Sequence, residues 1–176
     1  RAQVLEPREE AEIARGIETL TPVEDAASHA VRAMYEENPY PRWTIPALSL
    51  ARSPLTAWLA ARTGRAGAET GAIADVLIAG CGTGRQVIEV ASELADARVL
   101  AVDLSLSSLA FGMRKAREFG FDSIRFAQAD ILRLDALGRR FDYIDSSGVL
   151  HHLGDPAAGL AVLCRLLKDG GLIRLG

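Results

Sequence analysis

The chain has 176 residues, a formal net charge of −3, 49% hydrophobic residues and two cysteines. This length can form one sizeable core with an additional helical segment. The lack of a basic surplus argues against a nucleic-acid partner, and the apolar runs are far shorter than the roughly 20 residues of a membrane span. Two cysteines far apart in the sequence favour a cytoplasmic protein over a disulfide scaffold.

The first part of the chain, residues 1–70, is predicted to be a helical segment with a proline-rich connector. Residues 38–46 contain three prolines and are therefore expected to be extended or turned. Residues 64–72 are small and polar, which makes them the predicted linker. Apolar residues at helical spacing predict helices over residues 7–20, 21–37 and 53–64.

Several polar residues stand where a helix is expected to begin. Thr21 is the predicted N-cap of its helix, because Pro22 follows it and Glu24 completes a capping box. Ser105 and Asp155 are the predicted N-caps of two later helices.

From residue 73 onward, apolar runs alternate with amphipathic stretches, which predicts five parallel strands joined by four crossovers. The runs are apolar throughout, as in strands covered on both faces. We therefore predict an α/β fold, a Rossmann-like open parallel sheet with helices on both faces, over residues 71–176. Because the sequence ends in the fifth strand, we expect this domain to be C-terminally incomplete and part of a longer protein. The predicted strands are residues 73–80, 97–103, 123–130, 141–148 and 172–176.

The stretch LIAGCGTGRQ, residues 77–86, places three glycines directly after the first predicted strand. Gly80 would let the strand turn sharply, and Gly82 has no side chain to keep a ligand away from the backbone. Gly84 would open a helix whose first amides point to the same place. A tight strand–helix turn without a ligand is the alternative interpretation.

Two acidic residues end the neighbouring strands of the predicted sheet. Asp103 is placed to accept hydrogen bonds from both hydroxyls of a ribose, and Asp130 from the exocyclic amine of adenine. Either could instead cap the helix that follows it. Arg85 stands where a dinucleotide-binding turn would have its third glycine, and no phosphate-binding Gly-Lys-Ser/Thr ending is present. Among common adenosine cofactors, this favours S-adenosylmethionine.

In this order and spacing, five motifs resemble those of class I S-adenosylmethionine-dependent methyltransferases. The resemblance covers roughly residues 72–176. A weaker one links MYEENPYPRW, residues 34–43, to a segment that precedes this domain in a bacterial subgroup, some of whose members carry tetratricopeptide repeats. The five motifs are VLIAGCGTGRQ, VLAVDLSLSSLAFG, FAQADIL, FDYIDSSGVLHHLGDP and LLKDGGLIRLG.

The resemblance implies a role for each residue that matches a family motif. One position departs from the family pattern, because Ile78 stands where such domains usually carry an acid. An interaction with the amino end of the cofactor must then come from another residue or be absent. The implied contacts are Gly80, Cys81, Gly82 and Gly84 along the methionine part, Asp103 on the ribose, Leu104, Asp130 and Ile131 around the adenine, and Ser147, Gly148 and Val149 beneath the sulfonium.

Two further groups of residues are candidates for chemistry. His151 and His152 follow the fourth strand, and His151 is the first choice for a base if the acceptor is a hydroxyl. Tyr40, Arg42 and Trp43 form either a rigid tether for the N-terminal helices or a lid over substrate and cofactor, in which Arg42 would supply the interaction that Ile78 cannot make. No metal site is predicted.

The sequence thus favours an enzyme that transfers a methyl group from S-adenosylmethionine by in-line displacement. The expected acceptor is a small molecule rather than a protein, and neither a membrane nor a nucleic acid is an expected partner. A non-catalytic module that binds the cofactor or its product is the alternative, and a nicotinamide oxidoreductase is a third. The acceptor itself and the oligomeric state are left open by the sequence.

Overall fold

A computed structural model describes residues 5–24, 26–64 and 73–176. All but the first residue of the predicted linker, residues 64–72, lies outside these ranges, and so does the predicted boundary between residues 70 and 71. Within the described ranges, no helix has both the length and the apolar character that crossing a bilayer requires.

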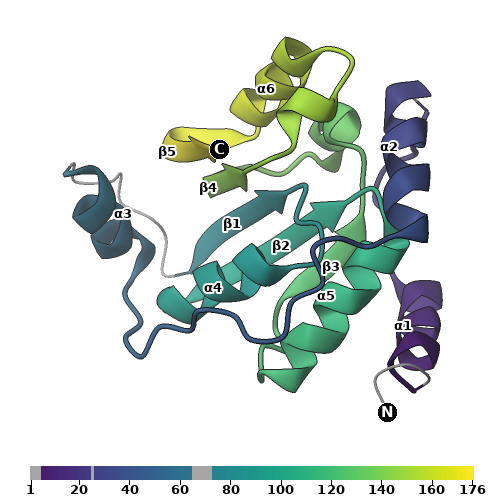
Figure 1. The fold of residues 1–176 in the computed structure, drawn as a ribbon. Helices are drawn as coiled ribbons and strands as arrows, with labels where there is room; N and C mark the ends of the chain where they lie inside the picture. The colour runs from purple at the N-terminus through teal and green to yellow at the C-terminus, as the bar shows by residue number, and fades with distance from the viewer. Residues whose placement is uncertain (1–4, 25, 65–72) are drawn as a thin grey trace.

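The centre of the molecule is a five-stranded parallel sheet in the order β3-β2-β1-β4-β5 (Figure 1). The predicted open parallel sheet is therefore confirmed. The last strand begins earlier than predicted, because the preceding helix ends at Arg165 and the chain pairs with β4 almost at once. The strands are β1 (Ala74–Ala79), β2 (Ala97–Asp103), β3 (Arg125–Gln128), β4 (Phe141–Ser146) and β5 (Leu167–Leu175).

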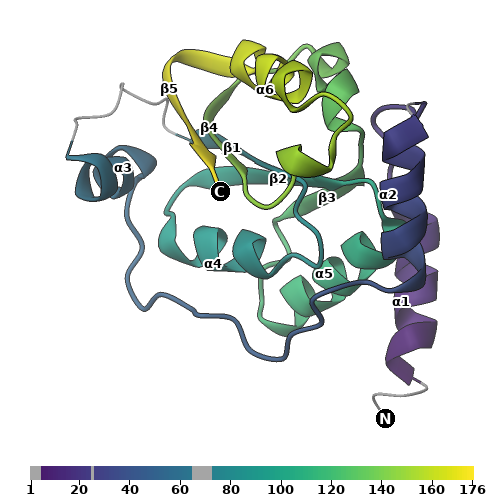
Figure 2. The same cartoon turned by 45° about the horizontal axis from the view of Figure 1, so that its top comes forward.

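Helices cover both faces of the sheet (Figure 2). The helices α4 (Arg85–Glu93) and α5 (Leu106–Glu118) lie on one face, while the 3-10 helix η1 (Ile131–Leu137) and α6 (Pro156–Arg165) lie on the other. Alternate residues of β1 belong to the two separate cores, which explains why the whole strand is apolar. A short helix α3 (Leu55–Thr63) packs Trp58 against Tyr143 of β4, and a second 3-10 helix η2 (Leu150–His152) follows β4.

The N-terminal helices α1 (Leu5–Gly16) and α2 (Ala26–Glu37) lie beside α5 at the β3 edge of the sheet (Figure 1). Buried Glu10 of α1 pairs with Arg114 of α5 at 3.0 Å. At the start of α5, the carboxylate of Glu36 accepts hydrogen bonds from the amides of Leu106 and Ser107 at 2.8 and 3.0 Å. A carboxylate at a helix N-terminus accepts hydrogen bonds from free amides and interacts favourably with the positive end of the helix dipole. The N-terminal segment is thus packed onto the domain.

The chain between α1 and α2 differs from the sequence prediction. Residues 18–20 run alongside β3 as an extended segment, with the Leu20 amide donating to the Gln128 carbonyl at 2.8 Å. Thr21 is buried, and its hydroxyl oxygen accepts a hydrogen bond from the Asp130 amide at 2.8 Å instead of capping a helix. The predicted N-cap at Thr21 is therefore wrong, and α2 begins at Ala26. The predicted caps Ser105 and Asp155 are confirmed.

Candidate functional site

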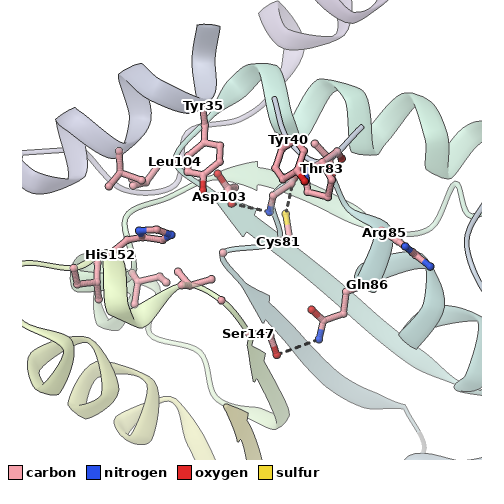
Figure 3. A pocket seen from close by; sticks show the side chains of 18 of the residues that line it. Tyr35, Tyr40, Cys81, Thr83, Arg85, Gln86, Asp103, Leu104, Ser147 and His152 are labelled. Carbon is pink, nitrogen blue, oxygen red and sulfur yellow. Dashed lines mark hydrogen bonds between the residues drawn. The ribbon is translucent and has the colours of Figure 1, made fainter. Parts of the chain in front are cut away.

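A cavity of about 630 Å³ opens at the carboxyl ends of the strands (Figure 3). Its walls come from the β1–α4 turn, from the residues that end or follow β2, β3 and β4, from β5, and from α2 and the connector. The sheet order reverses between β1 and β4, because the chain runs from β1 outward to β3 and then returns to the other side. Ligands of open α/β sheets bind at such a point.

The glycine turn at the end of β1 allows two close approaches. A Cβ atom on Gly80, whose φ is +77°, would overlap with the side chain of Val149. A Cβ on Gly84, with a φ of +78°, would lie 3.0 Å from the Cα of Gly112, so this glycine lets α4 start against α5. A Cβ on Gly82, in contrast, would meet no atom within 4 Å. The turn therefore presents bare backbone with open space above Gly82.

Asp103 is fixed against this turn by backbone amides. Its Oδ2 accepts a hydrogen bond from the Gly82 amide at 2.8 Å, and its Oδ1 accepts one from the Ser105 amide at 3.0 Å. Burial raises the pKa of Asp103 above its usual value, although both amide hydrogen bonds act to lower it. The carboxylate still lines the cavity, where its remaining lone pairs can accept hydrogen bonds from a ligand.

The wall beyond β3 consists of Asp130 and its neighbours. Asp130 is buried and caps η1, because its Oδ1 accepts a hydrogen bond from the Leu132 amide at 3.0 Å. The capping alternative for Asp130 is thus observed, and an additional contact to adenine stays a prediction. Leu104 and Ile131 line the same cavity and add apolar surface for a flat ring.

At the end of β4, three consecutive predicted residues line the opposite side of the cavity: Ser147, Gly148 and Val149. The Ser147 hydroxyl donates to Oδ1 of Asp145 at 2.8 Å, and the Gln86 side-chain amide lies 3.5 Å from the Ser147 oxygen (Figure 3). The cavity therefore has a mainly apolar end near Leu104 and a polar end near Gln86.

The structure brings nearly all predicted cofactor residues to this one cavity. Gly84 is the exception, because it lies behind the turn, where α4 meets α5. Burial, followed by the negative charge of Asp103, raises the pKa of the Cys81 thiol well above its usual value, so this side chain is a neutral part of the wall. The predicted cofactor residues that line the cavity are Gly80, Cys81, Gly82, Asp103, Leu104, Asp130, Ile131, Ser147, Gly148 and Val149.

Of the two histidines after β4, His152 lines the cavity and His151 does not. Their rings lie 4.0 Å apart between centroids, but His151 is exposed. The ring of His152 makes an edge contact with Tyr35 of α2, at 6.4 Å between centroids. The geometry thus moves the candidate base from His151 to its neighbour, because the η2 turn points only one of the two rings inward.

The connector contributes to the cavity with only part of the predicted group. Tyr40 and Pro41 line the cavity, whereas Arg42 does not. The guanidinium of Arg42 donates to the carboxylate of Glu10 at 2.8 Å and lies 4.6 Å from the ring centroid of Phe111. Arg42 therefore ties the connector to α1 and α5, and it does not compensate for the missing acid at position 78.

Trp43 also lies outside the cavity and acts as a tether. It is 8% exposed, and its indole N–H donates to the Thr83 carbonyl of the glycine turn at 3.0 Å. Its ring packs against Phe111 and Phe119, at 5.8 and 6.2 Å between centroids. The connector thus supports the glycine turn from behind.

The sequence interpretation missed several residues of the cavity. Ser28, Val31 and Tyr35 of α2 follow helical spacing, so the sequence could have shown that they share one face of the helix. Arg174 gives no such signal, because only the register of β5 brings it to the cavity. The additional lining residues are Ser28, Val31, Tyr35, Pro41, Thr83, Arg85, Gln86, Glu89, Leu153 and Arg174.

Curated relatives cover different parts of the chain. A protein of Synechococcus sp. is 32% identical over 169 residues, and the match covers 86% of this chain and 37% of that protein. A trans-aconitate 2-methyltransferase of Deinococcus radiodurans is 36% identical over 100 residues, which is 57% of this chain and 36% of that enzyme. The chain thus spans little more than a third of the length of these curated relatives.

Solved structures and a family model agree on the domain. An S-adenosylmethionine-dependent methyltransferase from Clostridium acetobutylicum has a TM-score of 0.52 at 28% identity, covering 57% of this chain and 41% of that one. A Rickettsia typhi protein solved in complex with AdoHcy has a TM-score of 0.51 at 29% identity, covering 57% and 20%. The family model described as "Methyltransferase domain" matches residues 76–171. The chain therefore belongs to the methyltransferase domain family.

Proposed function

We propose that this chain binds S-adenosylmethionine in the cavity at the strand ends and transfers its methyl group to an acceptor by in-line displacement. The observation that carries this proposal is the convergence of the open glycine turn, Asp103 and Asp130 on one cavity. Its volume of about 630 Å³ lies within the range of about 300–1,000 Å³ typical of small-molecule sites. The bare backbone above Gly82 fits a ligand that lies against it.

Each wall of the cavity has a role in this proposal. The cofactor, when bound, supplies the reactive methyl group, and the protein supplies position and electrostatics. Gly80, Cys81 and Gly82 hold the methionine part, and Asp103 accepts the ribose hydroxyls. Leu104, Asp130 and Ile131 surround the adenine, and Ser147, Gly148 and Val149 lie beneath the sulfonium. No covalent bond to the protein is needed, because the acceptor itself attacks the methyl carbon.

We infer that the acceptor is a small molecule. One relative is named for such an acceptor, trans-aconitate, and the cavity is bounded on the α2 side by Tyr35 and His152, which limits the space for a polymer. We further infer that residues 1–70 and 71–176 form one functional unit. The match to the Synechococcus protein covers 86% of this chain, which is more than the domain alone, so it includes part of the segment before the domain. A cytoplasmic location and the likeness of residues 34–43 to the segment of a bacterial subgroup stay predictions.

A non-catalytic binding module is the second candidate, and one observation favours it. Ile78 is buried and apolar at a position where the family pattern has an acid. A domain that has lost part of its cofactor site could keep the ligand as a sensor or structural group.

The experiment that tests the proposal is thermal unfolding with S-adenosylhomocysteine, followed by methyl transfer from labelled cofactor. At about one hundred times the dissociation constant, the ligand should add about 2.7 kcal/mol, or about 5–10 °C for a chain of this length. Absence of a shift would overturn the proposal, and a shift with a nicotinamide dinucleotide instead would favour the oxidoreductase. Binding without transfer to any acceptor, including the protein itself, would favour the module.

For an acceptor that must lose a proton, replacing His152 with alanine should lower kcat by about a hundred-fold or more. The reason is that His152 lines the cavity, where an imidazole can take a proton from the attacking group. The affinity for S-adenosylhomocysteine, measured by calorimetry, should change little. His151→Ala is the matched control, because this ring is adjacent but exposed. Equal losses in both variants would remove His152 from the chemistry.

A further inference from the structure

The strand β1 lacks the acid of the family pattern, but the neighbouring strand β4 carries an aspartate at the paired position. Ile78 of β1 is paired in register with Asp145 of β4, and Asp145 is paired in register with Arg174 of β5. Residues paired across a sheet point to the same face and lie close together. Ile78, Asp145 and Arg174 therefore form one row across three strands, on the face that carries α4.

Asp145 is the buried charged residue of this row. It is 0% exposed, and a buried carboxylate requires hydrogen bonds or an opposite charge. Its Oδ2 accepts from the Tyr143 hydroxyl at 2.9 Å and from Nη1 of Arg174 at 3.2 Å. Its Oδ1 accepts from the Ser147 hydroxyl at 2.8 Å. Burial, followed by the charge of Asp145, raises the pKa of Tyr143, so the phenol remains a donor.

Two of these three donors lie in the cavity wall. Ser147 and Arg174 line the polar end, together with Gln86. The side chain of Arg174 is 57% exposed, and only its Nη1 is used by Asp145 among the described residues. Nε and Nη2 are therefore available, and a guanidinium presents its donors in a fork that matches a carboxylate.

The other arginine of the cavity also has one nitrogen paired, but its side chain extends away from Ser147 (Figure 3). Nε of Arg85 donates to the carboxylate of Glu89 one turn later on α4, at 2.9 Å. Arg42, the replacement in the lid interpretation, is held by Glu10 outside the cavity. Arg174 is thus the arginine whose anchored guanidinium faces the polar end of the cavity with free donors.

We propose that Arg174, positioned by Asp145, binds the carboxylate of the cofactor's amino-acid tail, so that the tail is held at its carboxylate end where position 78 carries no acid for the amino group. This inference rests on the proposed function. It fits the shape of the cavity, since the polar end near Gln86 and Ser147 lies opposite the end near Leu104, where the adenine is expected (Figure 3). Arg174 contacts the ligand, and Asp145 is a positioning residue.

The test compares two ligands that differ only in the tail. S-adenosylhomocysteine carries the amino-acid group, and 5′-methylthioadenosine has the same adenosine and thioether without it. By calorimetry, Arg174→Gln should weaken S-adenosylhomocysteine about ten- to hundred-fold and leave methylthioadenosine unchanged, because the variant removes only a charge-assisted hydrogen bond to the tail. Arg174→Lys should recover part of the affinity. Asp145→Asn should show the same selectivity, which a purely structural role would not produce.

Arg165→Gln is the matched control, since Arg165 is an exposed arginine that pairs with Asp135 of η1 and does not line the cavity. It should bind both ligands as the wild type does. Wild-type affinity of Arg174→Gln for S-adenosylhomocysteine, or an equal loss for both ligands, would overturn the inference. Slower methyl transfer with unchanged S-adenosylhomocysteine affinity would assign Arg174 to the acceptor instead. A wild-type chain that binds neither ligand would show that the proposed function itself has failed.

Discussion

Replacing Trp43 with alanine is expected to lower the free energy of unfolding by about 3–5 kcal/mol. The side chain is buried between Phe111 and Phe119, and its removal leaves a large cavity in the core that the connector shares with α5. The variant also loses the hydrogen bond to the Thr83 carbonyl. Because that carbonyl belongs to the glycine turn, the affinity for S-adenosylhomocysteine should fall as well.

Urea denaturation followed by fluorescence or circular dichroism measures this destabilisation. Ile45→Ala is the matched control, because Ile45 lies in the same connector but is 75% exposed. Its unfolding free energy should stay within about 0.5 kcal/mol of the wild-type value. A Trp43→Ala chain as stable as Ile45→Ala would mean that the connector is not part of the core.

Asp103→Asn is expected to weaken the binding of S-adenosylhomocysteine by about ten- to hundred-fold, because hydrogen bonds to a charged acceptor contribute about 1.5–3 kcal/mol. The amide keeps the size of the side chain but removes the charge and one of the two acceptor oxygens. It also places an NH₂ group against the amide of Gly82 or of Ser105, both of which donate to the carboxylate in the wild type. Calorimetry measures the affinity, and Asp122→Asn, at an exposed aspartate after α5, is the control.

The raised pKa of Asp103 adds a second readout. The ionised carboxylate is the form that accepts both ribose hydroxyls, so ligand binding favours the deprotonated state. Affinity should therefore be constant above the raised pKa and fall as the pH is lowered through it. The fall should begin at a higher pH than for an ordinary aspartate, whose pKa is about 3.9. In Asp103→Asn this part of the pH dependence should disappear, and a profile identical to that of the wild type would assign the titration to another group.

Local patterns predicted much of the fold. The strand at 97–103 matches β2, and the caps at Ser105 and Asp155 are observed, because a cap is decided by residues within three positions of it. Thr21 also fits a capping pattern, but its partner is the amide of Asp130, 109 residues away. No local rule can weigh such a contact against a cap.

The same distinction applies to the candidate site. The residues implied by motifs on one strand end could be named, since each motif includes its own turn. Arg174 could not, because it reaches the cavity only through strand register. Helical spacing relates Tyr35 to Ser28 and Val31, but it does not show that this face of α2 docks against the cavity. Local residues also could not decide between the tether and the lid interpretation of Arg42, since its partners Glu10 and Phe111 come from two other helices.

The position of α2 determines where a fragment that contains the complete cavity must begin. Glu36 anchors this helix at the start of α5, and Ser28, Val31 and Tyr35 then close one side of the cavity. The family match begins only at residue 76. A fragment cloned to those boundaries would keep the strand ends and the glycine turn, but it would expose to bulk water the side of the cavity that α2 covers in the intact chain.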